Sequence, residues 1–316
     1  MTKETNPKLQ PSFLEHKWAV WALILLITLI WGYAWVLMKE ALQHMGPFTF
    51  SAFRFGTGAI TLFIVLFFMR LKKPSKVQLK HMVIVGLLQT TIVFLLVMYG
   101  MQFVDAGKSS VLLYSMPIWS SFLAARILKE NITKAKIAGL GLGVLGLVTI
   151  LGWDLFIGQS IRALFGEALI IIAAISWGAS NVYYRLKLQG IPNIQVTAYQ
   201  MGFGTIGIIL AAVVMEWGEP LQLNVSSVFQ ILFTGVLASA FCFTLWFVIL
   251  STIDMVTATL STLLVPVFGL LFSSVLLDEK LTTGVMAGAG FILSGIVIAQ
   301  LSKPKHTKVK SKSLSS

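Results

Sequence analysis

Residues 51–58 read SAFRFGTG, and residues 197–204 read TAYQMGFG. The two stretches share an alanine, an aromatic residue and two glycines at matching positions, at an offset of 146 residues. The same offset carries Trp31-Gly32 onto Trp177-Gly178, so a tryptophan–glycine pair precedes each stretch. Matches in the same order and at the same spacing indicate that the chain contains an internal duplication.

The duplication continues toward the C-terminus with a slightly larger offset. At an offset of 149 residues the matching pairs are Asp105 and Asp254, Pro117 and Pro266, Glu130 and Glu279, and Thr133 and Thr282. A glycine pattern repeats at the same offset, from Gly139, Gly141 and Gly146 onto Gly288, Gly290 and Gly295. A three-residue change in offset is what an insertion in a loop would produce.

The composition places the duplicated chain in a membrane. Hydrophobic residues make up 57% of the 316 residues and charged residues only 11%, too few for the surface of a soluble domain. The apolar residues form continuous stretches of about 20, long enough to cross a hydrocarbon core of about 30 Å. Transmembrane β-strands would instead alternate in segments of about ten residues. The sequence therefore predicts an all-α membrane protein with ten transmembrane helices. These spans 1 to 10 cover residues 18–38, 47–69, 81–99, 106–127, 132–152, 164–185, 192–217, 226–250, 256–276 and 281–301.

Each copy of the repeat contains five spans. The first repeat is expected over residues 18–152 and the second over 164–301, with an extracellular linker at 153–163 and tails at 1–17 and 302–316. Because five is odd, the second copy enters the membrane from the opposite face, so the fold is predicted to be two inverted five-helix repeats. Inverted repeats are typical of secondary transporters, in which the two halves exchange conformations.

Lysine and arginine are distributed unevenly between the two faces. Nineteen lie on the face that carries both termini, and four lie on the other. Because cytoplasmic loops carry the excess of these residues, we predict a multi-pass protein of the cell membrane with both termini in the cytoplasm. The net charge of +12 is spread over short loops and the tail, which argues against a nucleic-acid partner. The expected partners are the lipid bilayer and a small-molecule substrate.

These motifs together resemble the drug/metabolite transporter superfamily, specifically its EamA-type branch. The matching features are the Trp-Gly pairs, an arginine (Arg54) seven residues after Pro47, the prolines of spans 4 and 9 with the Glu and Thr that follow them, and glycine-rich spans 5 and 10. The resemblance covers about Trp18 to Leu301. It implies an exporter of amino acids, other small metabolites or toxic compounds, with a central cavity between the halves. Gln200 departs from the pattern, since Arg54 predicts a second arginine at this repeat-equivalent position.

Arg54 lies inside span 2, where a charge costs several kcal/mol. No acidic residue lies at a comparable depth in any predicted span. In one interpretation Arg54 faces the cavity and binds a substrate carboxylate, or it forms a gate by donating to carbonyls at helix ends. In the other, its side chain extends toward the extracellular loops and anchors span 2.

Aromatic residues gather in spans 1 and 6. Trp35 is expected to anchor span 1 at the membrane–water interface. Trp31 and Trp177 lie too deep for that role, so they either form the wall of a pocket for aromatic or cationic ligands or fill space between the halves. Tyr33 is a further candidate for lining the cavity.

Prolines and polar residues complete the predicted cavity. Pro117 and Pro266 are expected to kink spans 4 and 9 near their middle and to free carbonyls for binding or gating, although a static kink for packing is the alternative. The polar residues predicted to line the cavity are Gln89, Tyr114, Asn181, Gln200, Ser239, Thr259 and Thr262. Interhelical hydrogen bonds, worth about 0.6 kcal/mol each, are the alternative role for such residues.

Small residues at a spacing of four allow helices to approach closely. Gly139 and Gly143 form one such pair, and Gly284 and Gly288 form another. Their partner is either another span of the same chain or a second subunit in a homodimer.

Two charged residues near the outer ends of spans are further candidates. Lys108 follows Asp105 and is expected to point outward or to pair with that aspartate, and the alternative is a role in recognising anionic substrates. Glu167 is the acidic residue nearest to the middle of a span, which makes it the candidate for proton coupling.

The sequence excludes several kinds of chemistry. It contains no HExxH motif, no nucleotide-binding loop and only one cysteine, Cys242, so no catalytic residue, metal site or cofactor is expected. We therefore predict a secondary transporter that exports small metabolites such as amino acids, or amphipathic and cationic compounds, by alternating access. A non-transporting sensor or scaffold and an intramembrane enzyme are the alternatives.

Overall fold

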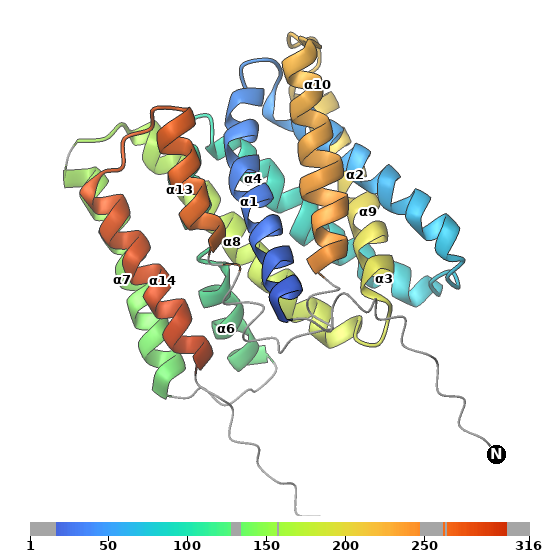
Figure 1. Ribbon diagram of the computed structural model, residues 1–316, viewed down its shortest axis with the longest axis horizontal. Helices are drawn as coiled ribbons and strands as arrows, with labels where there is room; N and C mark the ends of the chain where they lie inside the picture. Colours follow the sequence, from blue (N-terminus) through green and yellow to red (C-terminus); the bar gives the residue numbers. More distant parts are fainter. Residues whose placement is uncertain (1–16, 128–133, 157, 247–261, 263, 302–316) are drawn as a thin grey trace, which may run out of the picture.

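The computed structural model describes residues 17–127, 134–156, 158–246, 262 and 264–301 (Figure 1). The elements in these ranges are helices. Those long and apolar enough to cross a membrane are Val20–Ala41, Pro47–Met69, Lys76–Gly100, Ile161–Lys187, Asn193–Met215 and Val225–Trp246. Shorter apolar helices cover Ile137–Trp153, Leu264–Leu276 and Thr283–Ile298. The predicted all-α membrane fold is confirmed.

The first two helices define the ends of the bundle. Helix α1 (Lys17–Ala41) crosses it, and α2 (Pro47–Met69) returns. We call the end where α1 begins the proximal end and the end where α1 finishes the distal end (Figure 1). Pro47 occupies the first turn of α2, where its missing N–H removes no helical hydrogen bond.

Spans 3 and 8 share the same irregularity. Each contains a π-helical segment. Span 3 consists of α3 (Lys76–Val85), the π-helical segment η2 (Gly86–Ile92) and α4 (Val93–Gly100). In span 8, helix α10 (Val225–Leu232) continues into the π-helical segment η3 (Phe233–Phe241). The offset of 149 residues carries η2 onto the second part of η3. Helical turns of this kind are rare and occur often at functional sites. The repeat is therefore visible in the backbone as well as in the sequence.

Span 4 is not one kinked helix, as the sequence had suggested, but two helices. Helix α5 (Ala106–Leu113) ends before Tyr114, and α6 (Met116–Ile127) begins two residues later. Pro117 is the second residue of α6, where proline is compatible with a helix start. Its repeat equivalent Pro266 is the third residue of α13 (Leu264–Leu276). Both prolines therefore lie in a first turn rather than in the middle of a helix.

The remaining helices complete the two halves. Helix α7 (Lys134–Phe156) extends further than span 5 was predicted to, and α8 (Ile161–Lys187) begins earlier than span 6, so the predicted linker over residues 153–163 is shorter in the structure. Helix α9 (Asn193–Met215) is span 7, and α14 (Thr283–Leu301) is span 10.

The repeat-equivalent helices α7 and α14 lie side by side, at the left of Figure 1. Gly146 and Gly288 bring their backbones together, since a Cβ on either would lie 2.6–2.7 Å from the carbonyl oxygen of the other. Gly139 contributes to the same contact, because its carbonyl oxygen lies 2.5 Å from where a Cβ on Gly295 would be. Gly284 meets Trp153 of α7.

Gly143 meets Ile118 of α6. All four glycines predicted to mediate packing therefore face neighbours in the same chain, so a homodimer would need another surface.

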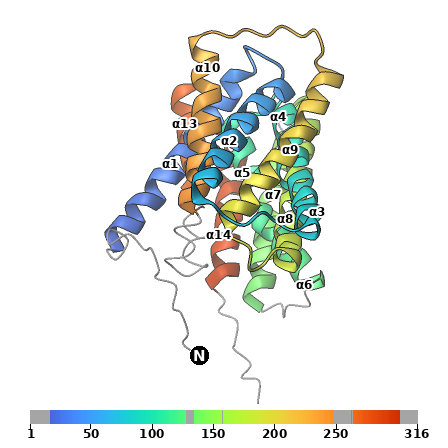
Figure 2. The same ribbon diagram turned by 90° about the vertical axis from the view of Figure 1, so that its right-hand side faces the viewer.

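The two halves interlock through α2 and α9, which pack against each other (Figure 2). Helix α2 crosses η3, and α9 crosses η2. A Cβ on Gly58 would lie 3.0 Å from the carbonyl oxygen of Gly235, and one on Gly204 would lie 2.8 Å from that of Gly86. The offsets of 146 and 149 carry Gly58 onto Gly204 and Gly86 onto Gly235, so these two crossings are repeat equivalents.

Candidate functional site

Arg54 lies at the crossing of α2 and η3 and is only 5% exposed. Its Nε donates to the hydroxyl of Ser239 at 3.4 Å, and its Nη1 donates to the thioether sulfur of Met38 at 2.8 Å. Its contacts within the described part of the chain include no carboxylate. The side chain is therefore turned into the bundle, and its predicted alternative role as an anchor to the extracellular loops is wrong.

Aromatic side chains surround this cation. The guanidinium carbon lies 5.0 Å from the ring centre of Phe55 and 4.9 Å from that of Phe94, and these two rings are themselves 4.3 Å apart. Helices α1, α2 and α4 and the π-helical segment η3 therefore meet at one buried charge. Cation–π contacts of this kind stabilise a desolvated cation by about 2 kcal/mol.

The second half contains a neutral version of the same contact. Gln200, the repeat equivalent of Arg54, accepts a hydrogen bond through Oε1 from the hydroxyl of Thr90 at 2.9 Å. Thr90 in turn is the repeat equivalent of Ser239, at the offset of 149. The inverted repeat thus places one helix–π-helix pair on each side of the α2–α9 contact. One pair carries a charge, whereas the other is an uncharged hydrogen bond.

The predicted tryptophans lie close to this junction and make structural contacts. The indole N–H of Trp31 donates to the carbonyl of Ala238 in η3 at 2.8 Å, and its ring meets Phe243 and Trp246. Trp177 packs edge-on against Tyr114, with ring centres 6.4 Å apart.

Tyr33 lies nearer the distal end of α1, where its ring meets Phe233 and Phe272. Trp35, expected at the membrane surface, is instead buried in the core, so that prediction is wrong.

Several predicted cavity residues form hydrogen bonds between helices. Gln89 accepts from the hydroxyl of Ser180 at 3.1 Å, and the amide of Asn181 donates to the sulfur of Met116 at 3.1 Å. The carbonyl of Thr262 accepts from the backbone of Val265, and Thr259 lies outside the described residues. The structure brings Arg54 and Ser239 together and places Tyr114 against Trp177, whereas Gln89 and Asn181 join α8 to its neighbours.

Comparisons with known proteins decide the family. The sequence model of the EamA-like transporter family matches this chain twice, over residues 17–152 and over residues 164–300. The chain belongs to the EamA-like transporter family. It is therefore a multi-pass membrane transporter, and the resemblance drawn from the motifs is confirmed.

Relatives extend over nearly the full length of this EamA-like transporter. The uncharacterized transporter YoaV of Bacillus subtilis is 37% identical over 86% of this chain and 94% of its own length. A probable amino-acid metabolite efflux pump of Salmonella typhimurium is 27% identical over 87% of this chain and 93% of its own length. One crystal structure of a protein, at 18% identity, has a TM-score of 0.62 and covers 90% of this chain and 98% of that one. That last likeness concerns the fold alone.

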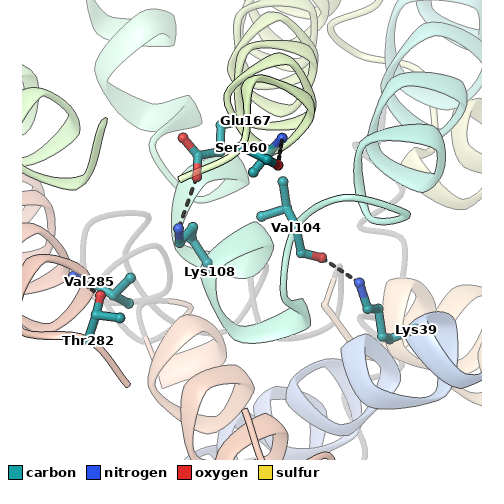
Figure 3. A network of polar contacts seen from close by, with 8 residues as sticks. Lys39, Val104, Lys108, Ser160, Glu167, Thr282 and Val285 are labelled. Atoms are coloured by element: carbon teal, nitrogen blue, oxygen red, sulfur yellow. Dashed lines mark hydrogen bonds and ion pairs between the residues drawn. The ribbon is translucent and has the colours of Figure 1, made fainter. Parts of the chain in front are cut away.

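The distal end of this EamA-like transporter is held by charged contacts that cross between the halves. Lys108 of α5 forms a buried ion pair with Glu167 of α8 at 2.9 Å, and Figure 3 shows the two side chains pointing toward each other. Lys108 is buried, so the prediction that it points outward is wrong, and its carboxylate partner in this ion pair is Glu167. The depth of Glu167 was visible in the sequence, but the partner that α5 supplies was not.

A second carboxylate holds the same half-helix from the other side. Glu279, which follows α13, accepts hydrogen bonds from the backbone N–H groups of Ala106 and Gly107 at 2.7 and 3.0 Å. These N–H groups belong to the first turn of α5, where a negative charge also interacts favourably with the helix dipole. We call α5 with Glu167 and Glu279 the distal clamp. The sequence marked Glu279 as a repeated residue without indicating this role.

Two further charged residues close the distal end. Glu216, after α9, accepts from the backbone N–H groups of Phe48 and Thr49 at 2.8 and 2.7 Å. Lys39 of α1 donates to the carbonyls of Met101 and Val104, and the second of these bonds is 2.7 Å long (Figure 3). Each residue uses its charge to satisfy backbone groups at a helix end.

Two cavities lined by described residues also lie at this end. One of about 210 Å³ opens beside Thr49 and Glu216, and a much smaller one adjoins Lys108 and Glu279. Within the described ranges no group of three His, Cys, Asp or Glu residues could hold a metal ion.

Proposed function

We propose that this transporter exports small metabolites, amino-acid metabolites among them, by alternating access around the junction at Arg54. The proposal is supported by the names of its relatives, which include a probable amino-acid metabolite efflux pump. The observation that carries it is the pair of repeat-equivalent crossings, α2 with η3 and α9 with η2, of which the first holds a buried cation and the second a neutral hydrogen bond. Mirrored halves around a polar centre are the architecture of carriers that expose one site alternately to the two sides.

In this proposal Arg54, Tyr114 and Ser239 contact the substrate. Gln200 is the matching position in the second half, and Trp31 and Trp177 hold the walls of the junction. Pro117 and Pro266 mark the helix starts that move when the site changes its exposure. One chain supplies both halves of the proposed site.

The proposed export also implies an orientation of the bundle in the membrane. We expect the proximal end to face the cytoplasm, because the spans assigned from the sequence put nineteen lysines and arginines on the face that carries both termini. Cysteine labelling in intact cells tests this arrangement. In a Cys242→Ser background, Glu219→Cys at the distal end should react with a membrane-impermeant maleimide, whereas Lys73→Cys should react only after permeabilisation. The reverse pattern would contradict export from the proximal side.

Counterflow in proteoliposomes tests the transport mechanism. Vesicles with purified protein are loaded with an unlabelled amino-acid metabolite and diluted into a trace of the same labelled compound. A carrier that alternates should accumulate label transiently, because internal substrate returns the site to the outside. Label that only equilibrates would indicate a channel, and label at the level of protein-free vesicles would contradict transport of that compound.

A further inference from the structure

We infer that Arg54 binds the carboxylate of substrates that carry a net charge of −1, and that zwitterions and cations of the same skeleton are poorer ligands. This inference rests on the proposed function, because it names the substrate class of the same site. It follows from three observations on the surroundings of Arg54: its hydrogen bonds, its charge balance and its counterpart in the second half.

The hydrogen bonds of Arg54 leave most of its binding capacity unused. A guanidinium carries five N–H donors, and a carboxylate accepts two of them in parallel. The contacts in the structure are one long bond to the hydroxyl of Ser239 and one to the sulfur of Met38. A thioether is a weak acceptor on a flexible side chain. A substrate carboxylate that displaces the sulfur of Met38 from Arg54 would therefore form two charge-assisted hydrogen bonds, and only one weak hydrogen bond would be lost.

The charge balance favours an anion over other ligands. Among the contacts of Arg54 in the described ranges there is no carboxylate, so the buried cation meets only neutral groups there: the rings of Phe55 and Phe94, a hydroxyl and a thioether. A monoanion makes the occupied site neutral. A zwitterion leaves one positive charge in a poorly hydrated environment, and an amine leaves two. Burial of uncompensated charge is strongly unfavourable.

The second half limits the ligand to one carboxylate. At the repeat-equivalent position Gln200 is already bonded to Thr90 and carries no charge. A second carboxylate on the ligand would find no matching cation there. The aromatic surface of Phe55 and Phe94 suits an apolar or aromatic body. The inferred class is therefore aromatic and aliphatic monocarboxylates without a free ammonium group.

Three compounds with the same phenylethyl skeleton test the prediction that the anion binds more tightly than the zwitterion or the cation. 3-Phenylpropionate is the anion, phenylalanine adds an ammonium group, and phenethylamine keeps only the ammonium. Isothermal titration calorimetry on the purified full-length protein should show affinity falling in that order, with a difference of about tenfold or more between the first two.

Substitutions of Arg54 test whether the order of the three affinities depends on this residue. Arg54→Gln should weaken binding of 3-phenylpropionate by about tenfold or more and remove the preference among the three compounds. Arg54→Lys keeps the charge but not the planar fork, so it should bind more weakly and retain the order. Arg70→Gln is the matched control, because it removes an exposed arginine just after α2 and should change nothing.

Two results would overturn the inference. One is phenylalanine or phenethylamine binding as tightly as 3-phenylpropionate. The other is unchanged affinity for the anion in folded Arg54→Gln, or in Arg54→Lys if the first variant does not fold. Counterflow separates the two proposals: the predicted binding order without counterflow contradicts transport alone. Counterflow of phenethylamine that ignores Arg54 contradicts the inference alone.

Discussion

Arg54 and Lys108 are both buried cations, yet their surroundings differ. Lys108 is held by the carboxylate of Glu167, whereas Arg54 meets a hydroxyl, a thioether and aromatic rings. A buried ion pair is a structural contact whose two charges compensate each other. A buried cation whose protein contacts are weak can gain a charged partner from a ligand. On this difference rests our proposal that Lys108 belongs to the distal clamp and that Arg54 contacts the substrate.

The ion pair of Lys108 and Glu167 gives a prediction at this scale. Lys108→Met should lower the free energy of unfolding by about 3–5 kcal/mol, because it leaves the carboxylate of Glu167 buried without this cation. The double variant Lys108→Met with Glu167→Gln should recover a large part of that loss. Thermal unfolding of the purified variants in detergent measures both. Equal destabilisation by the single and double variants would show that the pair contributes little through charge.

At the scale of elements, the spans were predictable and their irregularities were not. Span 2 was predicted over residues 47–69, the range of α2, because a proline and a continuous apolar run mark a helix without ambiguity. The break after α5 and the π-helical segments depend on packing against other helices, which hydropathy does not record. The candidate site was likewise predictable in part. Arg54 was found from the cost of a charge in a membrane, whereas Phe94 and Met38 carried no signal of their own.

The mirrored helix crossings are tested by adding a methyl group to their glycines. A Cβ on Gly86 would contact the carbonyl oxygen of Gln200, and one on Gly235 would lie 2.7 Å from that of Arg54. Gly86→Ala and Gly235→Ala should each lower stability by about 1–3 kcal/mol, since backbone cannot move aside easily. Gly141→Ala in α7 is the matched control, because nothing lies within 4 Å of its Cβ. If all three variants melt alike, the crossings are not closely packed.

The distal clamp is tested by fixing α5 in place. In a Cys242→Ser background, Gly107→Cys and Ser273→Cys would face each other, because a Cβ on Gly107 contacts the hydroxyl of Ser273. The disulfide should stop counterflow, and reduction should restore it, since α5 cannot then leave α13. Each single-cysteine variant is the control for the substitution itself. Full counterflow with the disulfide formed would mean that the distal end opens elsewhere.

At the scale of the whole molecule, the inverted repeat supplies its own internal comparison. Gln43 and Val225 are exposed at the distal end, and the offsets of 146 and 149 carry them onto Gln189 and Lys76 at the proximal end. The distance from residue 43 to 225 and the distance from residue 189 to 76 are therefore equivalent in the two halves. An exchange of conformations between the halves must exchange these two distances as well.

Pulsed electron–electron double resonance on spin labels at these two pairs, in the Cys242→Ser protein in liposomes, tests the central claim most directly. The account predicts that adding a transported substrate changes the two distance distributions in opposite directions, one lengthening as the other shortens. Two distributions that move together, or that stay fixed while counterflow proceeds, would contradict alternating access by mirrored halves.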